Sequence, residues 1–151
     1  KEMEQSKKIL ELGCGMHPRP GAINVDKLDL PGVDVVWDLD KFPYPFKDEE
    51  FDEIYGQDII EHLDDVFMVM EELYRILKLG GTIYFHTTYV KNEQSFTDPS
   101  HKHFFTLDSF DYFDNSTDLG KAYSFYTKAR FKILNKYLDN NNYTNFLLKK
   151  V

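Results

Sequence analysis

A short apolar run that ends in a glycine turn limits the fold of this chain more than any other feature. Ile9-Leu10-Glu11-Leu12 is followed directly by Gly13-Cys14-Gly15. Glycines at this point let the backbone turn tightly and approach a ligand closely. In an open parallel sheet, ligands bind beyond the carboxyl ends of the strands, where the strand order reverses. A Gly-x-Gly turn alone is weak evidence for a ligand site, so an ordinary turn stays open as the alternative.

Further apolar runs and one long amphipathic segment predict an α/β fold in layers. Strands are expected at residues 22–26, 33–37, 51–55 and 82–87. The segment 61–78 is expected to form the main helix, because its apolar side chains recur at helical spacing. The pair Gly80-Gly81 is expected to end that helix as a cap.

The last third of the chain is expected to hold a short helix and two strands. Thr106 or Asp108 is expected to cap a short helix that runs to about Phe113. A sixth strand is expected within 123–138 and a seventh at 143–151. The short turn at 140–142 predicts that these two strands form a hairpin, so the last strand is antiparallel.

The segment between the first two strands is too short and too rich in proline for a helix. Only Met16–Gly21 is available there, and it contains Pro18 and Pro20. Proline removes a backbone donor and fixes φ, so a regular helix cannot form in six such residues. We therefore expect an irregular loop or a single turn, with the first crossover helix shortened or missing.

Length and charge exclude several classes of protein. A chain of 151 residues fits one domain, 1–151. The formal net charge of −8 argues against a nucleic-acid surface, which needs a basic face. The longest stretch without Asp, Glu, Lys or Arg is Leu79–Val90, and a membrane span needs about 20 residues. The single cysteine, Cys14, and the lack of a signal-peptide pattern predict a reducing, cytoplasmic setting.

Acidic residues at the ends of the second and third strands suggest recognition of a nucleoside. Asp26 ends one strand, and Asp38-Leu39 follows the next. A carboxylate can accept both hydroxyls of a ribose, because it presents two oxygens and no donor. Asp38 can accept from an exocyclic amine, and the N–H of Leu39 can donate to a ring nitrogen. Each acid alone is explained as well by a strand-end turn, but together with the glycine turn they form a stronger signal.

The order and spacing of these motifs resemble the class I S-adenosylmethionine-dependent methyltransferases, in particular small predicted members of the methyltransferase-11-like type. The resemblance runs from about Lys8 to Phe113 and rests on six segments, Ile9–Gly15, Ile23–Asp26, Phe42–Phe46, Glu50–Tyr55, Ile60–Leu63 and Leu73–Gly81. It implies a Rossmann-like doubly wound sheet of seven strands, mostly parallel with an antiparallel last strand. The chain departs from the family at Met16, where a further glycine is usual, at Leu79, where proline is common, and in its missing first helix.

The resemblance also implies a cofactor, S-adenosylmethionine, with S-adenosylhomocysteine as the product. Glu11 would face the methionine amino group or organise the loop, and Asp26 would hold the ribose hydroxyls. Asp38 and Leu39 would read the adenine edge. The remaining implied cofactor contacts are Gly13, Cys14, Gly15, Lys27, Gly56 and Gln57. Without the first helix, Arg19 or His17 could take the methionine carboxylate.

Methyl transfer needs mainly alignment and exclusion of water, so no catalytic triad is required. Proximity alone can supply about 7–11 kcal/mol, and a general base is needed only where the acceptor must lose a proton early. The candidates for catalytic contacts are Asp58, Tyr89, His101 and Tyr112, each of which could equally be a pocket wall or core residue. His101 and His103 could act as a base, as a metal pair or as a structural clamp. We expect no metal, because two histidines at i and i+2 without a further ligand are weak evidence.

The methyl acceptor is not encoded in any motif, and a small molecule is the expected class. A sugar- or lipid-linked precursor or a protein side chain stays open, as does a homodimer. A nicotinamide-dependent dehydrogenase does not fit, because Pro18 stands where that fingerprint has glycine and Asp26 follows Gly13 too closely. A non-catalytic binding or scaffold subunit of the same fold is the main alternative.

Overall fold

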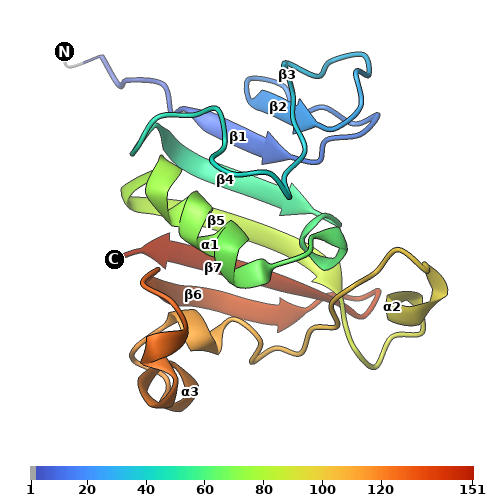
Figure 1. Ribbon diagram of the computed structural model, residues 1–151, viewed down its shortest axis with the longest axis vertical. Coiled ribbons are helices and arrows are strands. Elements are labelled where there is room, and N and C mark those ends of the chain that lie inside the picture. The colour runs from blue at the N-terminus through green and yellow to red at the C-terminus, as the bar shows by residue number, and fades with distance from the viewer. Residues whose placement is uncertain (1–2) are drawn as a thin grey trace.

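Seven strands form one mixed sheet in the computed structural model, which describes residues 3–151 (Figure 1). The strand order is β3-β2-β1-β4-β5-β7-β6, and β7 is antiparallel to both of its neighbours. The strands are β1 (Ile9–Leu12), β2 (Ile23–Asp26), β3 (Val35–Val36), β4 (Phe51–Gln57), β5 (Leu77–Thr88), β6 (Phe131–Leu138) and β7 (Tyr143–Lys150). The predicted Rossmann-like sheet with an antiparallel last strand is confirmed. The order reverses between β1 and β4, so the glycine turn after β1 lies at the point where ligands bind in such sheets.

The helices are short apart from one. They are α1 (Val66–Ile76), α2 (Gln94–Thr97) and α3 (Asp118–Ala122), with 3-10 turns η1 (Ile60–His62), η2 (Asp111–Phe113) and η3 (Ser124–Tyr126). The side chain of Asp65 caps α1 by accepting the N–H of Met68 at 3.0 Å. The residues of α1 that face the sheet are buried, as the helical spacing predicts.

The main helix is shorter than the sequence predicts at both ends. Glu61 lies in η1, and α1 ends at Ile76 rather than at the Gly80-Gly81 pair. Leu77 already has an extended backbone and pairs with Phe51 of β4, so the chain passes straight from helix to strand. Gly80, with φ of 80°, lies inside β5, where it accompanies a shift in the pairing register.

Two other predicted elements are also shorter than expected. Only Val35–Val36 of the predicted strand 33–37 pairs with β2. The helix expected from Thr106 or Asp108 is reduced to η2, which begins at Asp111. A hydrogen bond from the N–H of Asp108 to Oγ1 of Thr106 closes a local turn instead.

The hydrophobic core lies on the face of the sheet that α1 covers. Phe85 of β5 stacks on Phe110 at a ring-centroid distance of 5.4 Å, and Phe110 contacts Phe146 of β7 at 4.7 Å. Phe67 of α1 packs against Phe113 at 5.2 Å, so the segment that holds η2 covers the same face as α1.

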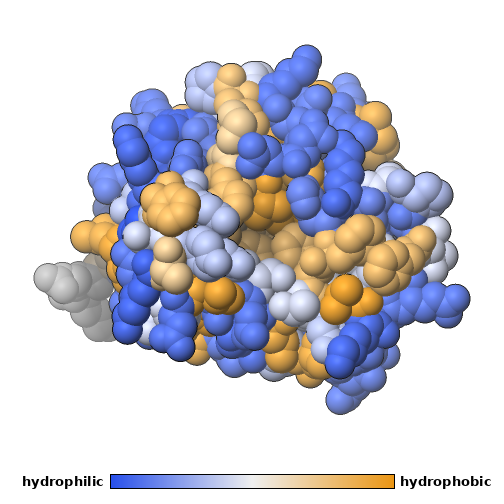
Figure 2. Space-filling model, turned by 60° about the horizontal axis from the view of Figure 1, so that its bottom comes forward, coloured by the Kyte–Doolittle hydropathy of each residue, from blue (hydrophilic) through white to orange (hydrophobic). Residues whose placement is uncertain are grey.

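Figure 2 shows the side of the molecule near α3, where hydrophobic side chains are interspersed with hydrophilic ones. Phe125, which is 77% exposed, belongs to the segment just after α3.

The opposite face of the sheet has a loop in place of a helix. Glu11, Tyr55, Tyr84 and Leu147 are register neighbours across four strands, so their side chains point to this same face. The guanidinium of Arg19 lies 3.8 Å from the ring centroid of Tyr55. Within residues 3–151, the connection from β1 to β2 contains no helix, as predicted from its prolines. No helix in this described part is long and apolar enough to cross a membrane.

Candidate functional site

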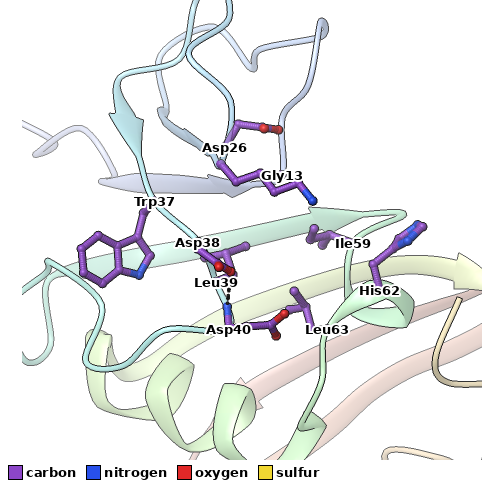
Figure 3. A pocket seen from close by; sticks show the side chains of 10 residues that line it. Gly13, Asp26, Trp37, Asp38, Leu39, Asp40, Ile59, His62 and Leu63 are labelled. Atoms are coloured by element: carbon purple, nitrogen blue, oxygen red, sulfur yellow. Dashed lines mark hydrogen bonds between the residues drawn. The ribbon is translucent and has the colours of Figure 1, made fainter. Parts of the chain in front are cut away.

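A cavity of about 140 Å³ lies beyond the carboxyl ends of β1 and β2 (Figure 3). We call it the first hollow; its lining residues are Gly13, Asp26, Lys27, Trp37, Asp38, Leu39, Asp40, Ile59, His62 and Leu63. Five of the predicted cofactor contacts are among them. Asp26, which ends β2, and the acids that follow β3 therefore line one space, although they come from different segments.

The carboxylate of Asp26 joins the end of β2 to the glycine turn after β1. Its Oδ2 accepts the N–H of Gly15 at 2.9 Å, and its Oδ1 accepts the N–H of Leu28 at 3.0 Å. Each carboxylate oxygen has two acceptor sites, so both oxygens can still accept a hydroxyl. Asp26 is thus oriented by the backbone and keeps acceptor capacity toward the first hollow.

Asp38 and Leu39 present an acceptor and a donor side by side. Oδ1 of Asp38 accepts the N–H of Asp40 at 2.9 Å, the bond drawn in Figure 3. Leu39 is buried, and its carbonyl accepts the hydroxyl of Tyr44 at 2.8 Å. Among the hydrogen bonds of residues 3–151, none uses the N–H of Leu39. This loop can therefore offer a carboxylate and a free N–H to the edge of a planar base.

A second hollow adjoins the first at Gly13. Its lining residues are Glu11, Gly13, Cys14, Gly15, Met16, His17, Gln57 and Asp58. Gly13 has φ of 62°, and a Cβ there would lie 2.7 Å from Cδ1 of Ile59. Only glycine meets both demands, which keeps the backbone open between the two hollows.

Glu11 organises the loop that replaces the first helix. Its Oε2 accepts from Nε of Arg19 at 2.7 Å, and the carboxylate is nearly buried. Burial raises the pKa of Glu11 above its usual value, although the bond to Arg19 opposes this. Burial likewise raises the pKa of the Cys14 thiol. Arg19 is thus held against Glu11 and Tyr55, whereas His17 lines the second hollow.

A third hollow lies between the end of β4 and the loop around α2. Its lining residues are Asp58, Glu61, His62, Thr88, Gln94, Thr97, Asp98, His101 and Tyr143. Asp58 also lines the second hollow, and His62 also lines the first. The three hollows therefore join around the residues that follow β4.

Comparison with known families identifies the family of the chain that carries these hollows. A sequence profile of the family described as methyltransferase domain matches residues 6–85, more than half of the chain. The chain belongs to this methyltransferase family. The resemblance to class I S-adenosylmethionine-dependent methyltransferases is thereby confirmed, and no curated protein matches the chain in sequence.

Solved methyltransferases share the fold at low identity. One from Thermotoga maritima, described as a possible histamine N-methyltransferase, has a TM-score of 0.67 and 17% identity over 97% of this chain and 84% of its own. A putative methyltransferase from Haloferax volcanii, solved with the Trm112 activator, has a TM-score of 0.63 and 15% identity over 99% of this chain and 84% of its own. The methyltransferase CalH, solved with S-adenosylhomocysteine, has a TM-score of 0.63 and 13% identity over 96% of this chain and 51% of its own. At these identities the likeness shows the fold.

The methyltransferase places one predicted cofactor residue and two predicted catalytic residues away from the hollows. Gly56 lines none of the three hollows, and a Cβ there would lie 2.9 Å from Cδ1 of Phe85. Tyr89 bridges to Phe105, and its carbonyl accepts from Ser95. Tyr112 stacks in a cluster of aromatic rings with Tyr123 and Tyr126 at 5.5 and 5.8 Å. Of the four candidates for catalytic contacts, Asp58 and His101 line the third hollow, whereas Tyr89 and Tyr112 line none of the three hollows.

The sequence analysis of this methyltransferase missed His86. Nδ1 of His86 lies 3.0 Å from Asp58 Oδ1, and Nε2 lies 3.3 Å from Asp139 Oδ2. The ring stacks on Tyr143 at 4.9 Å. The hydrogen bond with Asp58 is the main cause that raises the pKa of His86. The alternation along β5 places His86 on the face away from the core, but nothing local in the sequence pairs it with Asp58.

The linings also contain residues that sequence reasoning did not assign to a site. Trp37, Asp40 and Ile59 line the first hollow, and His62 lines the first and third. His103, by contrast, makes a hydrogen bond to the chain itself, since its Nε2 lies 2.7 Å from the carbonyl oxygen of Leu63. A carbonyl oxygen can only accept, so Nε2 carries the proton and His103 is a structural clamp.

Proposed function

We propose that this methyltransferase binds S-adenosylmethionine across the first and second hollows and transfers its methyl group to a small-molecule acceptor. One observation carries the proposal. All of the predicted cofactor contacts except Gly56 line these two hollows, which meet at Gly13. These residues come from the ends of β1, β2, β3 and β4. A non-catalytic protein that kept only the fold would not need these residue types to line the same two hollows.

The adenosine part fits the first hollow by the chemistry of its lining. Asp26 would accept the ribose hydroxyls with its remaining acceptor sites, and Lys27 lies beside it. Asp38 would accept from the exocyclic amine, and the unused N–H of Leu39 would donate to a ring nitrogen. Trp37 adds an aromatic wall to this space.

The methionine part fits the second hollow along Gly13, Cys14 and Gly15. The glycines bring backbone rather than side chains to this surface, and Gln57 borders it on the β4 side. Because Glu11 is occupied by Arg19, we infer that it shapes the loop and that His17 is the side chain nearest to the methionine carboxylate. When bound, the cofactor supplies a methyl group already activated by the positive sulfonium.

The acceptor would occupy the third hollow, next to Asp58 and His101. Asp58 lines both the second and the third hollow, so it stands where the two substrates would meet. Asp58 would accept a proton that the acceptor loses, and its hydrogen bond with His86 would orient the carboxylate for this. The net charge of −8 favours a small molecule over a nucleic acid as acceptor, and the lone Cys14 fits a cytoplasmic setting.

Calorimetric titration with S-adenosylmethionine and S-adenosylhomocysteine tests this proposal. Asp26→Ala should weaken binding about 10- to 100-fold, because hydrogen bonds to a charged group contribute about 1.5–3 kcal/mol. Asp29→Ala is the matched control, since Asp29 is an exposed acid on the same loop that lines neither hollow. A folded wild-type protein that binds neither compound would overturn the proposal and favour a scaffold role.

A further inference from the structure

Two histidines and an aspartate meet at the rim of the third hollow. His62 comes from η1, whereas Asp98 and His101 come from the loop after α2. Each offers one ligand atom, and these atoms all lie within 4.8 Å of one another. The two imidazole rings are nearly perpendicular, with centroids 4.6 Å apart. We propose that His62, Asp98 and His101 bind a divalent transition-metal ion, with zinc as the best match to this ligand set.

The hydrogen bonds of His101 leave one ring nitrogen free for a metal. Its Nδ1 lies 2.9 Å from the carbonyl oxygen of Ser95. A carbonyl oxygen can only accept, so Nδ1 carries the proton and Nε2 has a free lone pair. That Nε2 lies 3.7 Å from Oδ2 of Asp98. Histidines that bind metals are held in this way, with the second nitrogen donating to a carbonyl or carboxylate.

The hydrogen bonds of Ser100 leave one ring nitrogen of His62 free for a metal as well. The hydroxyl of Ser100 donates to Oδ1 of Asp98 at 2.6 Å, so its oxygen must accept at the 3.0 Å contact with Nδ1 of His62. Nδ1 therefore carries the proton of a neutral His62, and Nε2 is left as a ligand. The same Ser100 thus orients both a histidine and the carboxylate.

Asp98 keeps one oxygen for an ion. Its Oδ1 accepts both the N–H and the hydroxyl of Ser100, at 2.9 and 2.6 Å. Within residues 3–151, Oδ2 of Asp98 makes no hydrogen bond, and its charged neighbour is Nε2 of His101 at 3.7 Å. Two imidazole nitrogens and one carboxylate oxygen suit zinc and its neighbours in the first transition series better than calcium or magnesium. Three protein ligands also leave a coordination position open, as in catalytic zinc sites.

Two buried oxygens independently indicate that the third hollow takes a polar ligand. Oε1 of Glu61 and Oγ1 of Thr88 are buried, and neither has a hydrogen-bond partner in the described chain. Both residues line the same hollow as the three proposed ligands. Buried polar groups are nearly always hydrogen-bonded. We therefore expect these two oxygens to form hydrogen bonds with a bound molecule, because the described residues offer them no partner. A water or acceptor molecule on the open metal position would be such a partner.

The proposed ion would select the methyl acceptor, and this role rests on the proposed function. His62 also lines the first hollow, so the ion would lie where the cofactor and acceptor hollows join. We infer that the acceptor is a small molecule with a metal-binding oxygen, nitrogen or sulfur. The sequence analysis expected no metal because it considered His101 together with His103. In the structure, the histidine that lies beside His101 and Asp98 is His62, which comes from a distant segment.

Zinc titration calorimetry on protein treated with a chelator tests the metal site. We expect wild-type protein to bind one zinc ion, and His101→Ala and Asp98→Asn each to weaken binding at least tenfold. Asp29→Asn is the matched control for Asp98→Asn, because Asp29 is an exposed acid that lines none of the three hollows, and this variant should bind zinc as wild type does. Cobalt substitution gives a second readout, since imidazole coordination changes the visible absorption of Co²⁺, and His101→Ala should remove that change.

The outcomes separate this proposal from the proposed function. Each variant is checked by circular dichroism, and Asp98→Asn alters an exposed side chain, so it remains informative if His101→Ala does not fold. No zinc binding by folded wild type, or binding unchanged in both variants, would overturn the metal site. Zinc binding without S-adenosylhomocysteine binding would overturn the cofactor proposal instead, and the reverse result would overturn only the metal site.

Discussion

Asp58 and His86 are joined twice at the carboxyl ends of β4 and β5. Oδ1 of Asp58 lies 3.0 Å from Nδ1 of His86, and the N–H of Asp58 donates to the His86 carbonyl at 2.8 Å. Asp58 has φ of 53°, a left-handed backbone that aspartate tolerates better than most residues. The backbone bond therefore holds the carboxylate beside Nδ1 of His86.

The first prediction concerns pH and the stability contributed by His86. The pKa of His86 in the folded chain is raised, first by its bond with Asp58. Its charged form therefore stabilises the fold below the ordinary histidine pKa of about 6.5, and this contribution is lost as the pH rises through the folded value. His86→Gln should thus lower the free energy of unfolding by about 0.5–1 kcal/mol more at pH 5.5 than at pH 9, since Asp58 is half exposed.

Urea denaturation of wild type and His86→Gln at both pH values measures this difference. Asp58→Asn should show the same trend, because it removes the partner that raises the pKa. A difference between the two proteins that does not change with pH would contradict the assignment.

The second prediction concerns the two glycines that flank Cys14. Gly13→Ala should lower the free energy of unfolding by more than the about 1–2 kcal/mol that a left-handed residue costs, because its Cβ would also meet Ile59 at 2.7 Å. Gly15→Ala should show only the backbone cost, since its φ is 53° but no atom lies within 4 Å of the added Cβ.

A double variant separates steric overlap from backbone strain. Adding Ile59→Ala to Gly13→Ala should recover part of the loss, measured as a coupling energy between the two sites by denaturant unfolding. Equal losses for Gly13→Ala and Gly15→Ala would show that Ile59 does not limit the turn.

The third prediction concerns the pair of Glu11 and Arg19. Arg19→Met should lower the free energy of unfolding by about 1–3 kcal/mol, because it leaves a nearly buried carboxylate without its partner. Glu11→Gln in the same chain should restore part of that loss, because a neutral amide is less costly to bury. Strict additivity of the two substitutions in thermal unfolding would argue against their pairing.

Local sequence signals were enough for the elements that surround the first and second hollows. The glycine turn after β1 and the acids after β2 and β3 were identified from residue types at strand ends. The prolines of Met16–Gly21 correctly predicted a loop, because proline acts through its own backbone. These features depend on neighbours in sequence, so one sequence suffices to find them.

Features that depend on distant partners were missed. The end of α1 is set by pairing of Leu77 with Phe51, which helical periodicity does not reveal. The proposed ligands His62 and His101 meet only because the loop after α2 folds back onto η1, where the N–H of Lys102 donates to the Glu61 carbonyl at 2.8 Å. Likewise, His86 is paired with Asp58, which directly follows the adjacent strand β4.

The face of the sheet that carries a loop in place of a helix has a consequence for how this protein unfolds. In the described residues, the large buried side chains belong to one cluster on the α1 side, and the opposite face carries half-exposed tyrosines over strands that share that cluster. A sheet sandwiched between two helix layers can lose one layer and keep a partly ordered remnant. The part of the chain that the structure describes has no second apolar layer to support such a remnant, so the seven strands should unfold in one cooperative step.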